Sequence, residues 1–310
     1  MFTQIFIFVV ALLVVMRGAM IATTYAGLLA TSFKLSQYTV GFIVVAVISI
    51  LPETFIALNA AFEGIPSFGF GMILGSNVAD LTLIIALIVF IARRPLKVES
   101  KILKNHALYP FLLLLPIILG FDGYLSRPEG GALIVAGIVF YYLTLRHASG
   151  STPVPVEKKA DRFKDSLYIL LGVALLLIGS HFTVSSASNI ALMSGISPVL
   201  IGMLIVGLGT TMPEFFFSLE AVRHNHDALA IGDILGTVLA DATIVIGILA
   251  LLAPFAFPTT IIYVAGVFMV SAAFILFSFM RSGKVITGKE AFVLLVFWLT
   301  FILIECIITL

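Results

Sequence analysis

The stretch "GFIVVAVISILPETFIAL", residues 41–58, carries a proline and a glutamate side by side in an otherwise apolar run, and "GMLIVGLGTTMPEFFFSL", residues 202–219, repeats this pattern. The two stretches align without a gap at an offset of 161 residues, which pairs Glu53 with Glu214. A proline removes a backbone donor from a helix, and a carboxylate at the centre of a membrane costs about 2.5–3.5 kcal/mol. Because both copies keep such a pair, we interpret it as functional.

The composition is that of a membrane protein with many spans. Of the 310 residues, 61% are hydrophobic and only 11% are charged, and the mean hydropathy is +1.21, far outside the range of a soluble domain. Apolar segments long enough to cross a bilayer recur along the chain. We therefore predict an all-α fold of ten transmembrane helices, over residues 3–28, 38–62, 69–92, 105–121, 129–147, 165–193, 198–223, 228–253, 259–280 and 288–309.

The basic residues sort between the two sides of this ten-helix arrangement. One side of the membrane receives almost all of them, the other side receives only Arg127, and Arg17 lies within the first span. The positive-inside rule places the basic side in the cytoplasm, so both termini are expected to be extracellular in a multi-pass protein of the cell membrane. Fifteen of the seventeen Lys and Arg residues fall on that basic side: Lys34, Arg93, Arg94, Lys97, Lys101, Lys104, Arg146, Lys158, Lys159, Arg162, Lys164, Arg223, Arg281, Lys284 and Lys289.

The chain divides into two halves of five spans that enter the membrane from opposite sides. A first repeat over 1–147 and a second over 165–310 flank a polar cytoplasmic linker, 148–164. Their most similar regions are 38–92 and 198–253, and "GMILGSNVADLTLI" aligns with "GDILGTVLADATIV" at the same offset of 161. Inverted repeats with interrupted helices in matching positions point to a secondary transporter whose site lies near the middle of the membrane.

Each repeat contains two acids, and a hydroxyl residue precedes each acid by four positions. Residues four apart share one face of a helix, so each of four helices offers a carboxylate and a hydroxyl in the same direction. We expect these side chains to form a cage of oxygen ligands for a cation. The pairs are Ser49 with Glu53, Ser76 with Asp80, Thr210 with Glu214, and Thr237 with Asp241.

The two prolines add backbone oxygens to this cage. Pro52 and Pro213 cannot donate to the carbonyls of Ile48 and Gly209, and a desolvated cation can take up an unused carbonyl at membrane depth. An all-oxygen site suits Ca²⁺ and Na⁺, and the absence of Cys or His beside the acids argues against zinc or copper.

These motifs resemble those of the cation/Ca²⁺ antiporter superfamily, and within it the prokaryotic ten-helix Na⁺/Ca²⁺ exchangers. The resemblance covers the whole chain and is closest at "GLGTTMPE" and "GTVLAD" in the second repeat. It implies that Glu53 and Glu214 are central Ca²⁺ ligands, joined by Ser49 and Thr210. It also implies flanking Na⁺ or proton-linked sites. The complete set of candidate metal ligands is Glu53, Glu214, Asp80, Asp241, Ser49, Thr210, Ser76, Thr237, Ala46, Gly207 and Thr211.

The sequence departs from the family pattern at a few of these places. Ile48 replaces a glycine and Ile50 replaces a hydroxyl residue, while Asp80 and Asp233 stand where asparagine is common. A missing hydroxyl puts one Na⁺ site in question, and an added acid is a place where a proton can be held.

The leading hypothesis is a secondary antiporter, not an enzyme, that exchanges Ca²⁺ for Na⁺ by alternating access. A Ca²⁺/H⁺ exchanger of the same fold is the first alternative, followed by a channel. An intramembrane aspartyl protease using Asp80 and Asp241 is a remote one, since it leaves Glu53 and Glu214 without a role. The expected partners are Ca²⁺, Na⁺ and H⁺ as substrates and the lipid bilayer, with no cofactor, nucleic acid or obligate protein partner.

Overall fold

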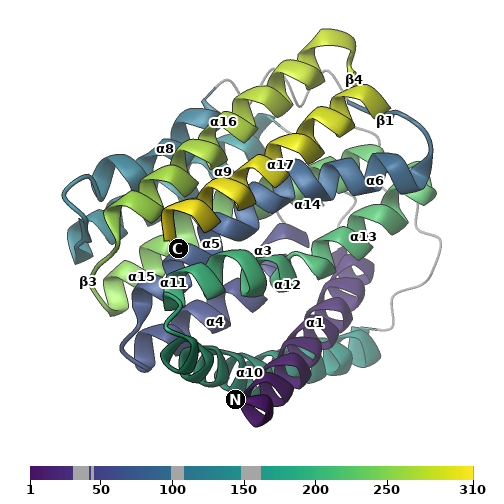
Figure 1. Cartoon of the computed structure of the whole chain (residues 1–310). Coiled ribbons are helices and arrows are strands. Elements are labelled where there is room, and N and C mark those ends of the chain that lie inside the picture. The colour runs from purple at the N-terminus through teal and green to yellow at the C-terminus, as the bar shows by residue number, and fades with distance from the viewer. Residues whose placement is uncertain (31–41, 43–44, 99–107, 148–161, 310) are drawn as a thin grey trace.

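The computed structural model describes residues 1–30, 42, 45–98, 108–147 and 162–309 as a bundle of helices (Figure 1). In this part of the chain, seven helices are long and apolar enough to cross a membrane, and two shorter apolar helices accompany them, Ala46–Phe62 and Tyr109–Leu119. The protein is a multi-pass membrane protein with the predicted all-α architecture.

The helices of the first repeat follow the predicted spans, although the start of the second span lies outside the described residues. They are α1 (Phe2–Ala30), α3 (Ala46–Ser49), α4 (Leu51–Phe62), α5 (Pro66–Ala79), the π-helical η3 (Asp80–Ile84), α6 (Ile85–Ala92), α8 (Tyr109–Leu119) and α9 (Arg127–His147).

The second repeat shows the same order of elements. They are α10 (Arg162–Ser194), α11 (Pro198–Ile201), the π-helical η4 (Gly202–Val206), α12 (Gly207–Thr210), α13 (Met212–Arg223), α14 (Asp227–Ala240), the π-helical η5 (Asp241–Val245), α15 (Ile246–Leu252), α16 (Thr259–Gly283) and α17 (Gly288–Thr309). Most of the predicted linker, 148–161, lies outside the described residues.

The internal repeat is visible in the element boundaries. The pairs α3 and α12, α4 and α13, α5 and α14, and η3 and η5 begin and end at residues that differ by 161. Since helix ends follow local backbone chemistry, such agreement means that the two repeats fold by the same local rules. The chain thus forms two inverted five-helix repeats.

Two very short β pairings supplement the helices at the loops. Strand β1 (Leu96–Lys97) pairs antiparallel with β4 (Val285–Ile286), and β2 (Tyr124–Leu125) pairs with β3 (Phe255–Ala256). Each pairing joins a loop of the first repeat to a loop of the second, so the repeats are fastened together outside the helices.

A partly buried ion pair joins the two repeats at the same end of the molecule as β1. The Arg94 guanidinium donates to both carboxylate oxygens of Asp227, at 2.6 and 2.8 Å, and also to the carbonyl of Val222. Hydrogen bonding to Asp227 raises the pKa of Arg94 above its ordinary value, so the guanidinium stays charged. The end of α6 is thereby tied to the turn between α13 and α14.

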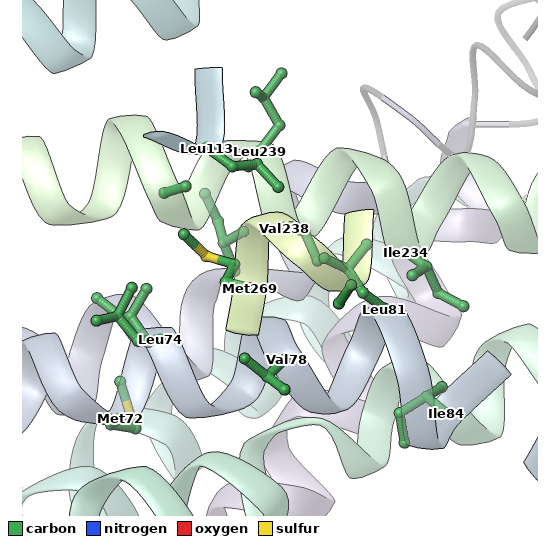
Figure 2. Close-up of a cluster of buried hydrophobic side chains, with 14 of the residues drawn as sticks. Met72, Leu74, Val78, Leu81, Ile84, Leu113, Ile234, Val238, Leu239 and Met269 are labelled. Carbon is green, nitrogen blue, oxygen red and sulfur yellow. The ribbon is translucent and has the colours of Figure 1, made fainter. Parts of the chain in front are cut away.

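The centre of the bundle is formed by α5 and α14. Every residue of α5 from Phe68 to Ala79 is buried. Figure 2 shows Leu74 and Val78 of α5 in one apolar cluster with Val238 of α14 and Met269 of α16. Polar side chains on these two helices are therefore enclosed by protein rather than by lipid.

Helices α1 and α10 lie together along one side of the bundle (Figure 1). The rings of Tyr25 and Tyr168 stack between them with centroids 4.3 Å apart. Both helices expose large apolar side chains such as Leu13 and Leu170, as expected for surfaces that face lipid.

Candidate functional site

Two breaks in the helices lie among the candidate site residues, one in each repeat. Ile50 separates α3 from α4 with φ −71° and ψ −5°, and Thr211 separates α12 from α13 with φ −76° and ψ −6°. An α-helix requires ψ near −42°, so the chain leaves the helix at both residues and restarts it at once. Pro52 and Pro213 then fall in the first turn of the new helix, where a missing N–H is tolerated.

The breaks also affect the carbonyls of Ile48 and Gly209, which are expected to lack the usual helical donor because of Pro52 and Pro213. The N–H of Ile50 turns toward the carbonyls of Ala46 and Ile48, and the N–H of Thr211 toward those of Gly207 and Gly209. An N–H only two residues away is a poorly aligned donor, and a carbonyl oxygen has two lone pairs. The Ile48 and Gly209 oxygens thus keep room for another partner.

The four candidate acids are all enclosed in the protein, with Glu53 and Asp80 1% exposed and Glu214 and Asp241 0% exposed. Glu53 and Glu214 stand in the first turn of α4 and α13, where the positive end of a helix favours a negative charge. All four lie in the interior of the protein, two from each repeat.

Asp80 and Asp241 each begin a π-helical turn, which the sequence analysis did not anticipate. Such turns are rare and concentrate at functional sites. The wider turn is closed by a hydroxyl, because Thr82 donates to the carbonyl of Val78 and Thr243 donates to that of Leu239, at 2.5 and 2.6 Å. A threonine two residues after each acid was the available signal in the sequence.

The candidate hydroxyl ligands are buried, and most of them donate their protons away from the acids that follow them. Ser76 donates to the Ile73 carbonyl at 3.0 Å, and Thr210 and Thr211 donate to the carbonyls of Gly207 and Leu208 at 3.0 and 2.9 Å. A hydroxyl whose proton is used in this way keeps its lone pairs for a cation. Ala46 and Gly207, which complete the candidate set, begin α3 and α12.

Several buried acceptors have no hydrogen-bond donor among the described residues. Buried polar atoms are nearly always paired, so unpaired acceptors in an apolar interior mark a place where a positively charged partner fits. Seven of these atoms belong to the candidate ligands, six carboxylate oxygens and one hydroxyl oxygen: Glu53 Oε2, Asp80 Oδ1, Glu214 Oε1, Glu214 Oε2, Asp241 Oδ1, Asp241 Oδ2 and Thr237 Oγ1.

The acids are not drawn together into a compact cluster. Within the described ranges, no group of three or more His, Cys, Asp or Glu side chains is close enough to hold a metal ion. Mutual repulsion between carboxylates opposes such a cluster, and Ca²⁺ also accepts hydroxyl and carbonyl oxygens. The four carboxylates are therefore separated from one another in the described structure.

Four further buried polar residues surround the candidates and were not placed in the ligand set. Tyr109 and Tyr141 each donate at 2.7 Å to the carbonyls of Leu235 and Gly236, just before Thr237. The other two are Asn77, which follows Ser76, and Asp233, which accepts a hydrogen bond from Ser49. Aromatic residues and a lone amide in apolar spans carry no distinctive spacing, which is why the tyrosines and Asn77 were missed.

The chain matches known exchangers over nearly its whole length. The family described as Sodium/calcium exchanger protein matches residues 3–146 and 165–306. The Sodium/calcium exchanger MaX1 of Methanosarcina acetivorans is 21% identical, over 96% of this chain and 97% of its own. The Inner membrane protein YrbG of Escherichia coli is 27% identical over 79% of each chain.

The solved structures agree with this fold. The sodium-calcium exchanger NCX_Mj, soaked with Na⁺ and Ca²⁺, is 22% identical and superimposes with a TM-score of 0.71 over 96% of this chain and 97% of its own. Because the matched family and its solved relative are transporters, the protease alternative is removed, and the activity is cation/Ca²⁺ antiport rather than enzymatic catalysis. The chain belongs to the Sodium/calcium exchanger protein family.

Proposed function

We propose that the chain moves Ca²⁺ across the membrane in exchange for Na⁺, and that both cations use the four carboxylates Glu53, Asp80, Glu214 and Asp241. The observation that carries this proposal is the set of six buried carboxylate oxygens without a hydrogen-bond donor among the described residues. An apolar interior with unpaired negative groups favours entry of a cation that sheds its water.

The chemistry of the surrounding atoms favours hard cations. Carboxylate, hydroxyl and carbonyl oxygens are ligands that suit Ca²⁺ and Na⁺. Among the described residues, no His or Cys belongs to the buried polar set, as a site for a softer metal would require.

Exchange follows when the two cations compete for the same acids. Ca²⁺ and Na⁺ cannot occupy one set of carboxylates together, so release of one on each side permits binding of the other. The inverted repeats supply two similar halves whose relative movement opens the site alternately to each side. The paired helices α1 and α10, which pack chiefly on each other along one side of the bundle, are the elements we expect to move.

A Ca²⁺/H⁺ exchanger remains the second candidate, on a specific observation. Asp80 and Asp233 are two further buried carboxylates beside Glu53, Glu214 and Asp241. Ile50 supplies no hydroxyl. An interior with many acids and one fewer neutral oxygen favours proton binding over Na⁺ binding.

We expect an outward Na⁺ gradient to drive Ca²⁺ uptake into proteoliposomes at least roughly tenfold faster than a pH gradient alone, because Na⁺ is the coupled ion. The measurement is radioactive Ca²⁺ uptake into Na⁺-loaded vesicles diluted into choline, with a protonophore added to remove any pH gradient. If the protonophore abolishes uptake and the Na⁺ gradient has no effect, the Ca²⁺/H⁺ alternative is the correct one.

A separate prediction concerns orientation. We expect both termini to be extracellular, since fifteen of the seventeen Lys and Arg residues are assigned to the other side. In a background where Cys306 is replaced by alanine, an impermeant thiol reagent applied to intact cells should label cysteines introduced at Phe2 or Leu310 and spare one at Ala160. The reverse pattern would show that the chain has the opposite orientation.

A further inference from the structure

The polar faces of the second repeat extend one helical turn beyond the four-carboxylate region. Ser218 follows Glu214 by four residues on α13, and Asp233 precedes Thr237 by four residues on α14, and both are 0% exposed. Residues four apart share a helix face. Since α13 and α14 are joined by a short turn and run in opposite directions, both extensions point to the same end of the molecule, where Arg94 binds Asp227.

Asp233 connects three elements at this level. Ser49 of α3 donates to its Oδ1 at 3.1 Å, and Ser218 of α13 donates to its Oδ2 at 3.3 Å. Both oxygens of a fully buried carboxylate are thus used by serine hydroxyls, one of which belongs to the candidate ligand set.

The first repeat has no equivalent of this arrangement. The residue that corresponds to Asp233 is Met72, a member of the buried apolar cluster in Figure 2, and Ser218 corresponds to Ala57. Thr210, which corresponds to Ser49, donates to the carbonyl of Gly207 and also lies against the carboxylate of Glu53. The two hydroxyls therefore have different partners: Ser49 binds a carboxylate outside the candidate ligand set, whereas Thr210 binds a backbone carbonyl and lies against a candidate ligand.

We propose that Asp233 is a positioning residue that sets the orientation of Ser49 and thereby the affinity of the site for Ca²⁺; this rests on the proposed function. A serine hydroxyl has one proton and two lone pairs, and a serine in a helix otherwise donates to a carbonyl three or four residues earlier. By accepting the proton at Oδ1, Asp233 holds the Ser49 lone pairs toward the cation. Partners that orient a metal ligand in this way commonly control its affinity.

The test is a double-mutant cycle on Ca²⁺ affinity, measured by Ca²⁺ titration calorimetry on the purified full-length protein. Asp233→Asn replaces the carboxylate by an amide oxygen, which is a weaker acceptor for the Ser49 hydroxyl. It should weaken Ca²⁺ binding several-fold more in the wild-type background than in Ser49→Ala. Loss of the Asp233 charge acts in both backgrounds, so the difference between them isolates the effect that passes through Ser49.

Two comparisons make the cycle specific. In a Ser76→Ala background, Asp233→Asn should keep its full effect, because Ser76 donates to Ile73 rather than to Asp233. Ser49→Thr keeps a hydroxyl, as at the equivalent Thr210. This variant should bind Ca²⁺ better than Ser49→Ala and should remain sensitive to Asp233→Asn.

A charge-neutral variant tests the same inference if Ser49→Ala binds too little Ca²⁺ to measure. Ser218→Ala removes a donor to Asp233, together with a longer contact to the carbonyl of Ala230 at 3.4 Å, and introduces the residue present at position 57. It should weaken Ca²⁺ binding a few-fold in the wild type and have no further effect in Asp233→Asn. Equal effects of Asp233→Asn in the wild-type and Ser49→Ala backgrounds, or an effect of Ser218→Ala that persists in Asp233→Asn, would overturn the proposal. A wild-type protein that binds no Ca²⁺ would instead refute the proposed function.

Discussion

Ca²⁺ transport should fall below about 1% of the wild-type rate in Glu53→Gln and in Glu214→Gln, while both variants should remain folded in the membrane. Each substitution keeps the shape of the side chain but removes a full negative charge from a fully buried position. Removing one partner of a buried charge pair costs roughly 2–5 kcal/mol, and about 1.4 kcal/mol is a factor of ten in affinity. The two residues lie on different repeats, so neither can replace the other.

Each variant has a matched control on its own helix. Glu63 ends α4, and the half-exposed Glu220 lies two turns beyond Glu214 on α13. Glu63→Gln and Glu220→Gln change the same chemical group at the edge of the protein and should transport Ca²⁺ at close to the wild-type rate. The measurement is Na⁺-driven Ca²⁺ uptake, normalised to the amount of monodisperse protein. Wild-type transport by either buried-acid variant would remove that glutamate from the proposed site.

The sequence allowed the repeat and its broken helices to be predicted because their causes are local. A proline follows Ile50 and Thr211 by two residues, at the start of a new helix in each case, and the constant offset of 161 residues places this break in both repeats. The helix boundaries accordingly agree with the apolar spans over the described residues.

Features that depend on the partner of a side chain were not predictable in the same way. The hydroxyl of Ser49 has a nearby glutamate in sequence, yet its acceptor is Asp233, 184 residues away. The π-helical turns at Asp80 and Asp241 are likewise not marked by any spacing of apolar residues in the sequence. Spacing along a helix identifies which residues share a face, but it does not determine which atoms on another helix meet that face.

The structure also gives different hydrogen-bond partners to residues that are equivalent in the alignment of the two repeats. Ser49 and Thr210 occupy the same position of the repeat, but Ser49 donates to Asp233 and Thr210 donates to the carbonyl of Gly207. Two copies with matching helix boundaries can thus orient equivalent hydroxyls differently. The difference lies in side chains, such as Asp233 at the position of Met72 and Ser218 at that of Ala57, rather than in the fold.

Close backbone contacts at Gly75 and Gly236 in the middle of the bundle repeat in both halves, as the helix breaks do. They are the basis of a second prediction with a large effect. A Cβ added at Gly75 would lie 2.1 Å from the carbonyl oxygen of Met203, and one added at Gly236 would lie 2.4 Å from that of Phe42. Phe42 and Met203 are equivalent residues of the two repeats, so each glycine allows the backbone of one repeat to touch that of the other. Because a backbone oxygen cannot rotate away as a side chain can, adding the methyl group must separate the helices.

Gly75→Ala and Gly236→Ala should each lower the free energy of unfolding by about 3 kcal/mol, the upper part of the usual range for overpacking. They should also abolish transport, since Ser76 and Thr237 are the next residues and would be displaced with the backbone. Gly131→Ala is the matched control, because it lies within α9 and an added Cβ there would meet nothing within 4 Å. Alanine is the better helix former by roughly 1 kcal/mol, so this variant should be slightly more stable than the wild type. Thermal unfolding in detergent, followed together with Ca²⁺ uptake, measures both effects. Wild-type unfolding and uptake in Gly75→Ala would mean that the two repeats are not in backbone contact there, and that the distance between them does not control the site.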